Sequence, residues 1–151
     1  MDLALAEAAK ALGMGEVPVG AVVVSGRGEV LGTGHNTPES GVDPTAHAEI
    51  AAIREAARKT GNYRLGGSVL VCTLEPCLMC VGAMLQARIS GLVYGAMDAK
   101  AGAVKSRMQA LDEPWLNHQI WHLDRILEEE CSSQLSAFFT AKRMVKNRQE
   151  V

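Results

Sequence analysis

Continuous hydrophobic runs recur along this chain, and each has the length of a buried strand. The first run, residues 17–24, ends at the glycine-containing turn 25–28 and leads into a second run at 30–34, which predicts a hairpin. Further strands are expected at residues 68–73 and 92–95, with a weaker fifth strand at 120–123.

Segments with helical periodicity alternate with these strands. The expected helices cover residues 1–15, 46–59, 77–87 and 124–147. Because two helices follow the hairpin and connect successive strands, we expect two crossovers, parallel strand pairing and an α/β sandwich. Residues 98–118 contain Gly102, Pro114 and mixed charge, which is typical of a long functional loop.

The composition is that of an ordinary globular protein. The chain has 151 residues, of which 48% are hydrophobic and 21% charged, so we expect a single domain over residues 1–151. The first residues lack the basic start and apolar middle of a signal peptide, and no run is long enough to span a membrane. Four cysteines fit a reducing compartment, and a cytoplasmic location is therefore expected.

The net charge of −2 does not by itself indicate a nucleic-acid-binding protein. Two groups of basic residues nevertheless stand out in the second half of the chain: Lys100, Lys105 and Arg107, then Lys142, Arg143, Lys146 and Arg148. Cations at the end of a helix also suit its dipole, which accounts for part of the second group. Composition thus permits a nucleic-acid partner without indicating one.

The candidate chemistry lies in the sequences His47-Ala48-Glu49 and Pro76-Cys77-Leu78-Met79-Cys80. A structural zinc ion is normally held by four protein ligands, whereas a catalytic zinc ion has three and keeps one position for water. No other Cys or His lies near either sequence, so His47, Cys77 and Cys80 supply three ligands. The pattern predicts a catalytic zinc site with one ion per subunit.

Both halves of this pattern are expected at helix starts. The segments 43–45 and 75–76 each join a capping side chain to a proline that suits the first helical position. On a helix, Cys77 and Cys80 share one face, and the helix N-terminus favours their thiolate forms. Glu49, two residues after His47, would point away from the metal ligands, so we expect it to move protons to and from the water instead.

Taken alone, the Cys-x-x-Cys pair could instead be redox-active or form part of a structural zinc site. The combination of both sequences favours a different interpretation, because His-x-Glu with Pro-Cys-x-x-Cys is the known mark of zinc nucleobase deaminases. Cys72 and Cys131 are expected to be core thiols, and Trp115 and Trp121 to lie in the core or an interface.

Most of the chain, from about residue 16 to 143, resembles the bacterial tRNA-specific adenosine deaminases of the cytidine/deoxycytidylate deaminase superfamily. The segments that carry the resemblance are 16–21, 35–36, 43–50, 62–65, 73–80, 98–100, 117–118 and 138–139. The resemblance implies a three-layer α-β-α sandwich with a central mixed five-stranded sheet, forming one zinc-dependent deaminase domain. It also implies hydrolytic deamination of adenosine to inosine at the wobble position of a tRNA anticodon loop.

The resemblance further implies roles for individual residues. The implied zinc ligands are His47, Cys77 and Cys80, and the implied catalytic proton shuttle is Glu49. The implied substrate-binding residues are Val19 and Asn36 at the base, Asp98 and Lys100 at the flanking nucleotides, and Phe138, Phe139 and Arg143 on a C-terminal helix that closes over the RNA. The implied partners are the anticodon stem-loop of a tRNA, an arginine tRNA being the family expectation, and a second copy of the chain in a homodimer.

Local chemistry agrees with two of these roles but leaves alternatives. Asn36 can hold a base edge, and Asp98 can accept a hydrogen bond from a ribose 2′-hydroxyl. Either side chain could instead cap a turn or loop. The chain departs from the family pattern at Met97, His35 and Lys142, which bears on RNA affinity more than on the chemistry.

Three other functions remain open from the sequence. A deaminase of free guanine, cytosine or dCMP would use the same zinc ligands, although segments 98–100 and 138–139 argue against it. A non-enzymatic partner subunit is expected to lack the shuttle carboxylate, which is present as Glu49. A zinc-stabilised RNA-binding module would keep RNA affinity without turnover.

Overall fold

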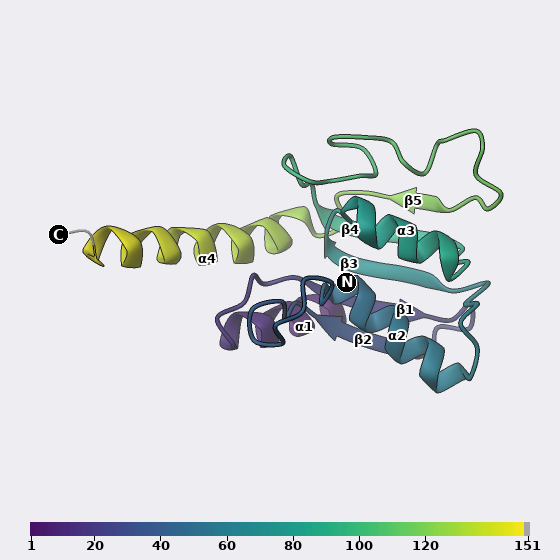
Figure 1. The fold of residues 1–151 in the computed structure, drawn as a ribbon, viewed down its shortest axis with the longest axis horizontal. Coiled ribbons are helices and arrows are strands. Elements are labelled where there is room, and N and C mark those ends of the chain that lie inside the picture. The colour runs from purple at the N-terminus through teal and green to yellow at the C-terminus, as the bar shows by residue number, and fades with distance from the viewer. Residues whose placement is uncertain (150–151) are drawn as a thin grey trace.

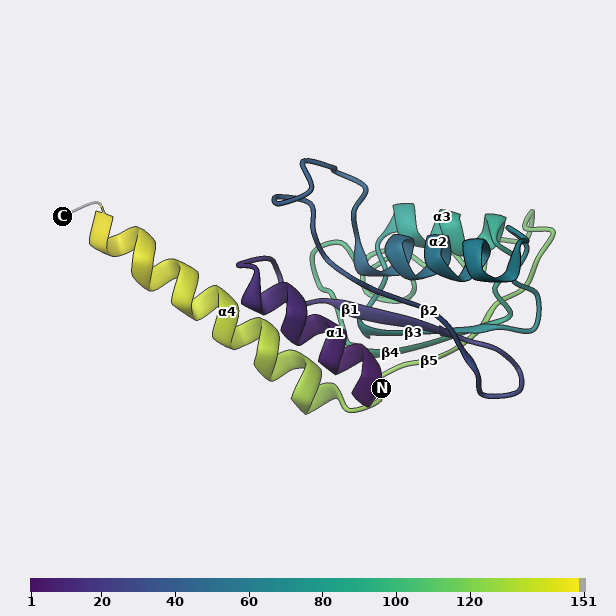
Figure 2. The same ribbon diagram turned by 90° about the horizontal axis from the view of Figure 1, so that it is seen from below.

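The computed structural model describes residues 1–149 and shows a five-stranded sheet with helices on both faces (Figure 1). The elements are α1 (Asp2–Gly13), β1 (Gly20–Val24), β2 (Val30–His35), α2 (Ala48–Thr60), β3 (Val69–Leu74), α3 (Leu78–Gln86), β4 (Gly91–Ala96), β5 (Trp121–Leu123) and α4 (Glu128–Gln149). Helices α2 and α3 cover one face of the sheet, and α1 and α4 lie on the other (Figure 2). The expected three-layer sandwich is confirmed.

The sheet is mixed, with the strand order β2-β1-β3-β4-β5. Strand β1 pairs antiparallel with both β2 and β3, whereas β3–β4 and β4–β5 are parallel pairs. Strands β2 and β3 therefore run in the same direction on either side of β1. As a result, the carboxyl ends of β2, β3 and β4 all lie at one edge of the sheet, which is where ligands bind in open α/β sheets.

Two boundaries differ from the sequence expectation by more than two residues. The first strand begins at Gly20 and not at residue 17, because the amide of Val19 bonds to the carbonyl of Val17 in a tight turn before the sheet begins. The last helix begins at Glu128 and not at residue 124, because Arg125 and Leu127 adopt the left-handed backbone conformation, with φ of 59° and 52°. A helix cannot run through such residues.

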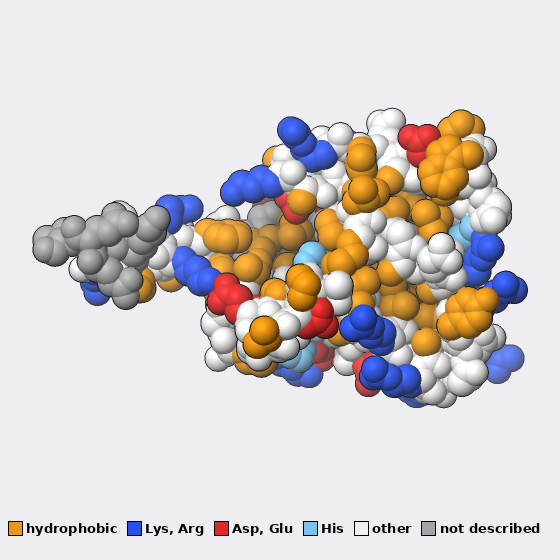
Figure 3. All heavy atoms as spheres, viewed as in Figure 1, with side chains coloured by type: hydrophobic (Ala, Val, Ile, Leu, Met, Phe, Trp, Pro, Cys, Tyr) orange, Lys and Arg blue, Asp and Glu red, His pale blue; other side chains and the backbone are white. Residues whose placement is uncertain are grey.

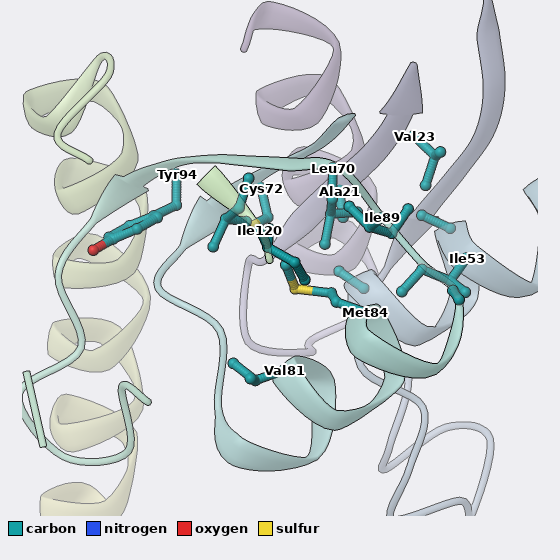
Figure 4. Packing of buried hydrophobic residues seen from close by; sticks show 14 of the residues in the cluster. Ala21, Val23, Ile53, Leu70, Cys72, Val81, Met84, Ile89, Tyr94 and Ile120 are labelled. Atoms are coloured by element: carbon teal, nitrogen blue, oxygen red, sulfur yellow. The ribbon is translucent and has the colours of Figure 1, made fainter. Parts of the chain in front are cut away.

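The main hydrophobic core lies between the sheet and the α2–α3 layer. Figure 4 shows Met84 of α3 directed towards the strands that carry Leu70 and Cys72, and Val81 of the same helix belongs to the same core. Cys72 and Cys131 are both buried, as expected for core thiols. The tryptophans are not in the core, because Trp115 is 75% and Trp121 51% exposed.

Helix α2 packs unusually close to β2, and glycines make this approach possible. A Cβ atom on Gly34 would lie only 2.3 Å from the carbonyl oxygen of Ala48, and a Cβ atom on Gly32 only 2.3 Å from that of Ala52. The position of α2 over the sheet therefore depends on the absence of side chains at these two positions. Within residues 1–149, no helix is both long and apolar enough to cross a membrane.

Candidate active site

The three expected metal ligands meet where α2 and α3 begin. The sulfur of Cys77 lies 3.5 Å from His47 Nδ1 and 3.7 Å from the sulfur of Cys80, and the Cys80 sulfur lies 3.6 Å from His47 Nδ1. Zinc held tetrahedrally at ordinary bond lengths would separate two sulfurs by about 3.8 Å, and a sulfur from a nitrogen by about 3.6 Å. The donor set thus fits one zinc ion in both chemistry and spacing.

The thiols of Cys77 and Cys80 have pKa values shifted in opposite directions. The hydrogen bond shared with Cys80, together with that to His47, lowers the pKa of Cys77 to about 4. The same shared hydrogen bond and burial raise the pKa of Cys80. A thiolate at Cys77 is therefore available to a metal at neutral pH, and a bound cation would favour the second thiolate.

The helix starts are capped differently from the sequence expectation. His47 and Cys77 are the N-cap residues of α2 and α3, and neither makes a side-chain cap. Asp43 and Glu75 do not cap these helices either: Asp43 accepts hydrogen bonds from Thr45, and Glu75 from another loop. The Ala48 amide, in the first turn of α2, is instead capped by Asn36 Oδ1 at 2.9 Å, from the end of β2.

Glu49 lies in the first turn of α2 and is only 4% exposed. Burial raises the pKa of its carboxyl group to about 7. Within the described residues, the group that could hold a metal consists of His47, Cys77 and Cys80 without Glu49. This arrangement leaves the Glu49 carboxylate beside the ligands, where it can exchange protons with a bound molecule.

A cavity of about 230 Å³ opens at this edge of the sheet. Its lining joins segments that are far apart in the sequence: Val17, Val19, Asn36, Pro38, His47, Glu49, Leu74, Glu75, Cys77, Asp98 and Ala101. The structure therefore brings together the metal ligands, Glu49 and three of the expected substrate-binding residues, namely Val19, Asn36 and Asp98. They meet because residues 36, 75 and 98 all follow the carboxyl ends of strands that run in the same direction.

Asp98 both lines the cavity and caps its own loop. Its Oδ1 atom accepts hydrogen bonds from the amides of Lys100 at 2.9 Å and Ala101 at 3.1 Å. The loop-capping alternative is thus correct for one carboxylate oxygen. Lys100 is exposed on the same turn and does not line the cavity.

The expected contacts on the last helix are not part of the cavity lining. Phe138 is buried and packs edge-to-face against Phe139, with 5.4 Å between ring centroids. Arg143 is exposed and donates a hydrogen bond to Thr140 on its own helix. The structure does not bring Phe138, Phe139 or Arg143 to the metal ligands, so their contact with RNA stays a prediction.

Lys142 ties this helix to the segment between β2 and α2. Its ammonium group lies 3.2 Å from Glu39 and 5.0 Å above the ring of Phe138. His35, the other departure beside the pocket, has Nδ1 only 2.8 Å from the carboxylate of Glu7 on α1. These two residues therefore face neighbouring elements and not the cavity.

Glu75 is the functional candidate that the sequence interpretation missed. Its side chain lines the cavity, yet it is only 2% exposed and accepts hydrogen bonds from several backbone amides. The only sequence signal was its place directly before Pro76-Cys77, which was interpreted as a helix cap.

Comparison with known proteins agrees with this geometry. Residues 1–96 match the family model for the cytidine and deoxycytidylate deaminase zinc-binding region. The chain is 48% identical over 146 residues to the tRNA-specific adenosine deaminase of Haemophilus influenzae, covering 97% of this chain and 84% of the relative. It is 44% identical over 146 residues to that of Bacillus subtilis, covering 97% and 90%.

A solved structure from a study of A-to-I editing by tRNA:A34 deaminases at the wobble position of transfer RNA superposes with a TM-score of 0.86. It is 44% identical in sequence, and the match covers 89% of this chain and 97% of that one. Together with the zinc-compatible donor set, these similarities show that the chain belongs to the tRNA-specific adenosine deaminases, a branch of the cytidine and deoxycytidylate deaminase family.

Proposed function

We propose that this protein hydrolytically deaminates adenosine to inosine at the wobble position of a tRNA anticodon loop, with an arginine tRNA as the first candidate. The observation that carries the proposal is the single cavity that holds the His47, Cys77 and Cys80 donors beside the buried Glu49 carboxylate. A zinc ion bound there would lower the pKa of a water molecule to about 7 and stabilise negative charge.

Glu49 would carry the protons of the reaction. Water supplies its oxygen to C6 of adenine, one of its two protons passes to ring N1, and the other leaves with the exocyclic amino group as ammonia. Glu49 can take a proton from the water and deliver it to the departing nitrogen, because its carboxyl group lines the same cavity as the metal ligands. The Glu49 side chain is only 4% exposed, so bulk water is kept away from the carboxylate and from the reacting base.

Asn36 would orient the base. Its Oδ1 atom is already used by the amide of Ala48, so its NH₂ group is the part that can donate to an acceptor on the adenine edge. Val19, only 3% exposed, adds an apolar wall to the same cavity. The structure thus combines a fixed donor with an apolar surface, which suits a flat purine ring.

The flanking nucleotides would lie over the loop that begins at Asp98. One oxygen of Asp98 caps this loop, and the other can accept a hydrogen bond from a ribose 2′-hydroxyl. Lys100 is exposed on the same turn, where it can contact a phosphate. These positions support an RNA substrate larger than a free nucleobase.

The cytoplasmic location expected from the sequence stays a prediction.

We also propose a homodimer in which the second copy covers the outer side of α3. A hollow of about 450 Å³ lies there, between α3 and the loop before β5. Leu78 is 56% and Trp115 75% exposed at its rim, and Figure 3 shows hydrophobic side chains gathered on this face. Light scattering should give twice the chain mass for the wild type and a monomer for Leu78→Asp; a wild-type monomer would contradict the proposal.

The decisive test of the activity is inosine formation in an arginine tRNA anticodon stem-loop, run beside free adenosine, cytosine and guanine. The control is Glu49→Ala, which should bind zinc without turnover. Wobble inosine that disappears in this variant would support the proposal. Ammonia from a free base, with the RNA unchanged, would indicate the small-molecule alternative, and RNA binding without any product would indicate a binding module.

A further inference from the structure

We propose that Glu75 is a positioning residue for RNA: its buried carboxylate fixes the shape of residues 98–106 and so sets the affinity for nucleotides next to the edited adenosine. This inference rests on the proposed function and assigns a specific task to a side chain that neither holds the metal nor moves protons. The carboxylate lies directly after β3, and the segment it holds follows β4.

The contacts of Glu75 all go to one loop. Its Oε1 atom accepts hydrogen bonds from the amides of Val104 at 3.1 Å, Lys105 at 2.7 Å and Ser106 at 2.9 Å. Its Oε2 atom accepts from the amide of Asp98 at 3.0 Å and from the hydroxyl of Ser106. Both ends of the loop are thus bound to a single ionised side chain.

A buried carboxylate with these partners organises the backbone around it. Hydrogen bonds to a charged acceptor are roughly twice as strong as neutral ones, and four amides here have the same carboxylate as partner. The loop also approaches so closely that a Cβ atom on Gly102 would lie 2.3 Å from the carboxyl carbon of Glu75. The segment therefore wraps around the carboxylate instead of merely touching it.

The same segment presents the residues proposed to meet RNA. Asp98 caps the turn that carries Lys100, and its own amide is held by Glu75. The loop meets the metal side through the backbone, where Gly102 forms an isolated β-bridge with Cys77 and the amide of Ala103 donates to the carbonyl of Pro76 at 2.9 Å. Loss of the carboxylate contacts should consequently shift the flanking contacts while His47 and Glu49, on α2, keep their positions.

The test uses steady-state editing of a tRNA anticodon stem-loop by the full chain. Glu75→Gln keeps the side-chain volume but places an NH₂ group near the amide of Asp98, where an acceptor is needed. We expect KM for the stem-loop to rise about tenfold or more with kcat within about threefold, and one zinc per chain retained. Ser106→Ala, which removes only the hydroxyl contact, should raise KM in the same direction by about threefold.

The matched control is Glu55→Gln. Glu55 also accepts a hydrogen bond from a backbone amide, that of Thr33, but does not line the cavity, so its loss should leave KM within about twofold. A second readout uses stem-loops with 2′-deoxyribose beside the edited nucleotide. This change should raise KM for the wild type but much less for Glu75→Gln, because the flanking contact is already lost.

The outcomes separate the inference from the function. If the wild type edits and Glu75→Gln has an unchanged KM, the inference is overturned while the proposed function stands. A loss of zinc and kcat at constant KM would make Glu75 a support of the metal site and would also overturn it. If Glu75→Gln fails to fold, an unchanged KM in Ser106→Ala decides against the inference. A wild type that makes no inosine defeats the proposed function itself.

Discussion

Replacement of Gly34 by alanine should lower the affinity for zinc, because it displaces the start of α2, the helix that follows the ligand His47. Gly34 lies on β2 and supports the first turn of α2, which directly follows His47. An added Cβ atom would lie 2.3 Å from the carbonyl oxygen of Ala48 and 2.6 Å from the amide nitrogen of Ala52. Both neighbours are backbone atoms, so no flexible side chain can rotate away to make room.

The required displacement can be worked out from these distances. Ordinary contact for a Cβ atom begins near 3.4 Å, so the carbonyl of Ala48 at 2.3 Å must move away by about 1.1 Å, and the first turn of α2 with it. Metal ligands must stay within about 0.2 Å of their bond lengths, so this movement of His47 relative to Cys77 and Cys80 is several times too large. We expect zinc affinity to fall about 10- to 100-fold, with a loss of stability of about 1–3 kcal/mol from overpacking.

The assay is competition for zinc between the purified protein and a chromogenic chelator, with urea unfolding measured in parallel. Gly32→Ala is the matched control, because its Cβ atom would meet the carbonyl of Ala52 at the same 2.3 Å but one turn further from His47. It should lose similar stability and less zinc affinity. Gly13→Ala, with no atom within 4 Å of the new Cβ atom, should change neither.

Wild-type zinc affinity in a folded Gly34→Ala variant would refute the reasoning. It would mean that the ligand geometry is restored by loop movement, and that the close packing of α2 on β2 does not set the position of His47. Equal losses of zinc affinity in Gly32→Ala and Gly34→Ala would show instead that α2 moves as a rigid body.

Three further expectations concern single side chains of the site. Glu49→Ala should keep stoichiometric zinc by atomic absorption and lose at least about 100-fold in kcat for inosine formation, and loss of zinc would show it to be a ligand. Cys80→Ala should bind little zinc and show no activity, because a ligand of the metal is lost. Removal of zinc from the wild type by a chelator should lower its melting temperature, and an unchanged melting temperature would show that metal binding does not stabilise the fold. Asn36→Ala should lose about 1 kcal/mol of stability in urea with the cap on Ala48, while Asn36→Asp keeps the acceptor and the stability but not the activity; equal stability of both variants would contradict the capping role.

The elements that sequence alone predicted are those encoded by local patterns. Residues that are neighbours in the chain determine the hairpin and the helices before and after β3. The same local patterns contain the spacing of His47, Cys77 and Cys80. Glu49 was expected to lie apart from the ligands because a regular helix points two such side chains in different directions. His47 is instead the extended N-cap residue before α2, so helical geometry does not set the angle between these two side chains.

The residues that sequence alone could not assign depend on contacts between distant segments. Asn36 caps α2 from 12 residues away, and Glu75 meets the loop after β4 at separations of 23 to 31 residues. The predicted start of α4 was wrong for a different reason. Arg125 and Leu127 are not glycines, and nothing in their residue type indicates a left-handed backbone. Only the folded chain reveals these constraints.

The cavity has two walls that the fold supports by different means, and this separation bears on how the enzyme can vary. The metal ligands and Glu49 sit at the starts of α2 and α3, whose positions depend on helix packing against the sheet. The wall that begins at Asp98 depends instead on hydrogen bonds to one carboxylate. We therefore expect a change in the 98–106 segment to alter RNA binding more than the hydrolytic centre, whereas a change at the α2–β2 contact should displace His47 and lower the rate of hydrolysis first.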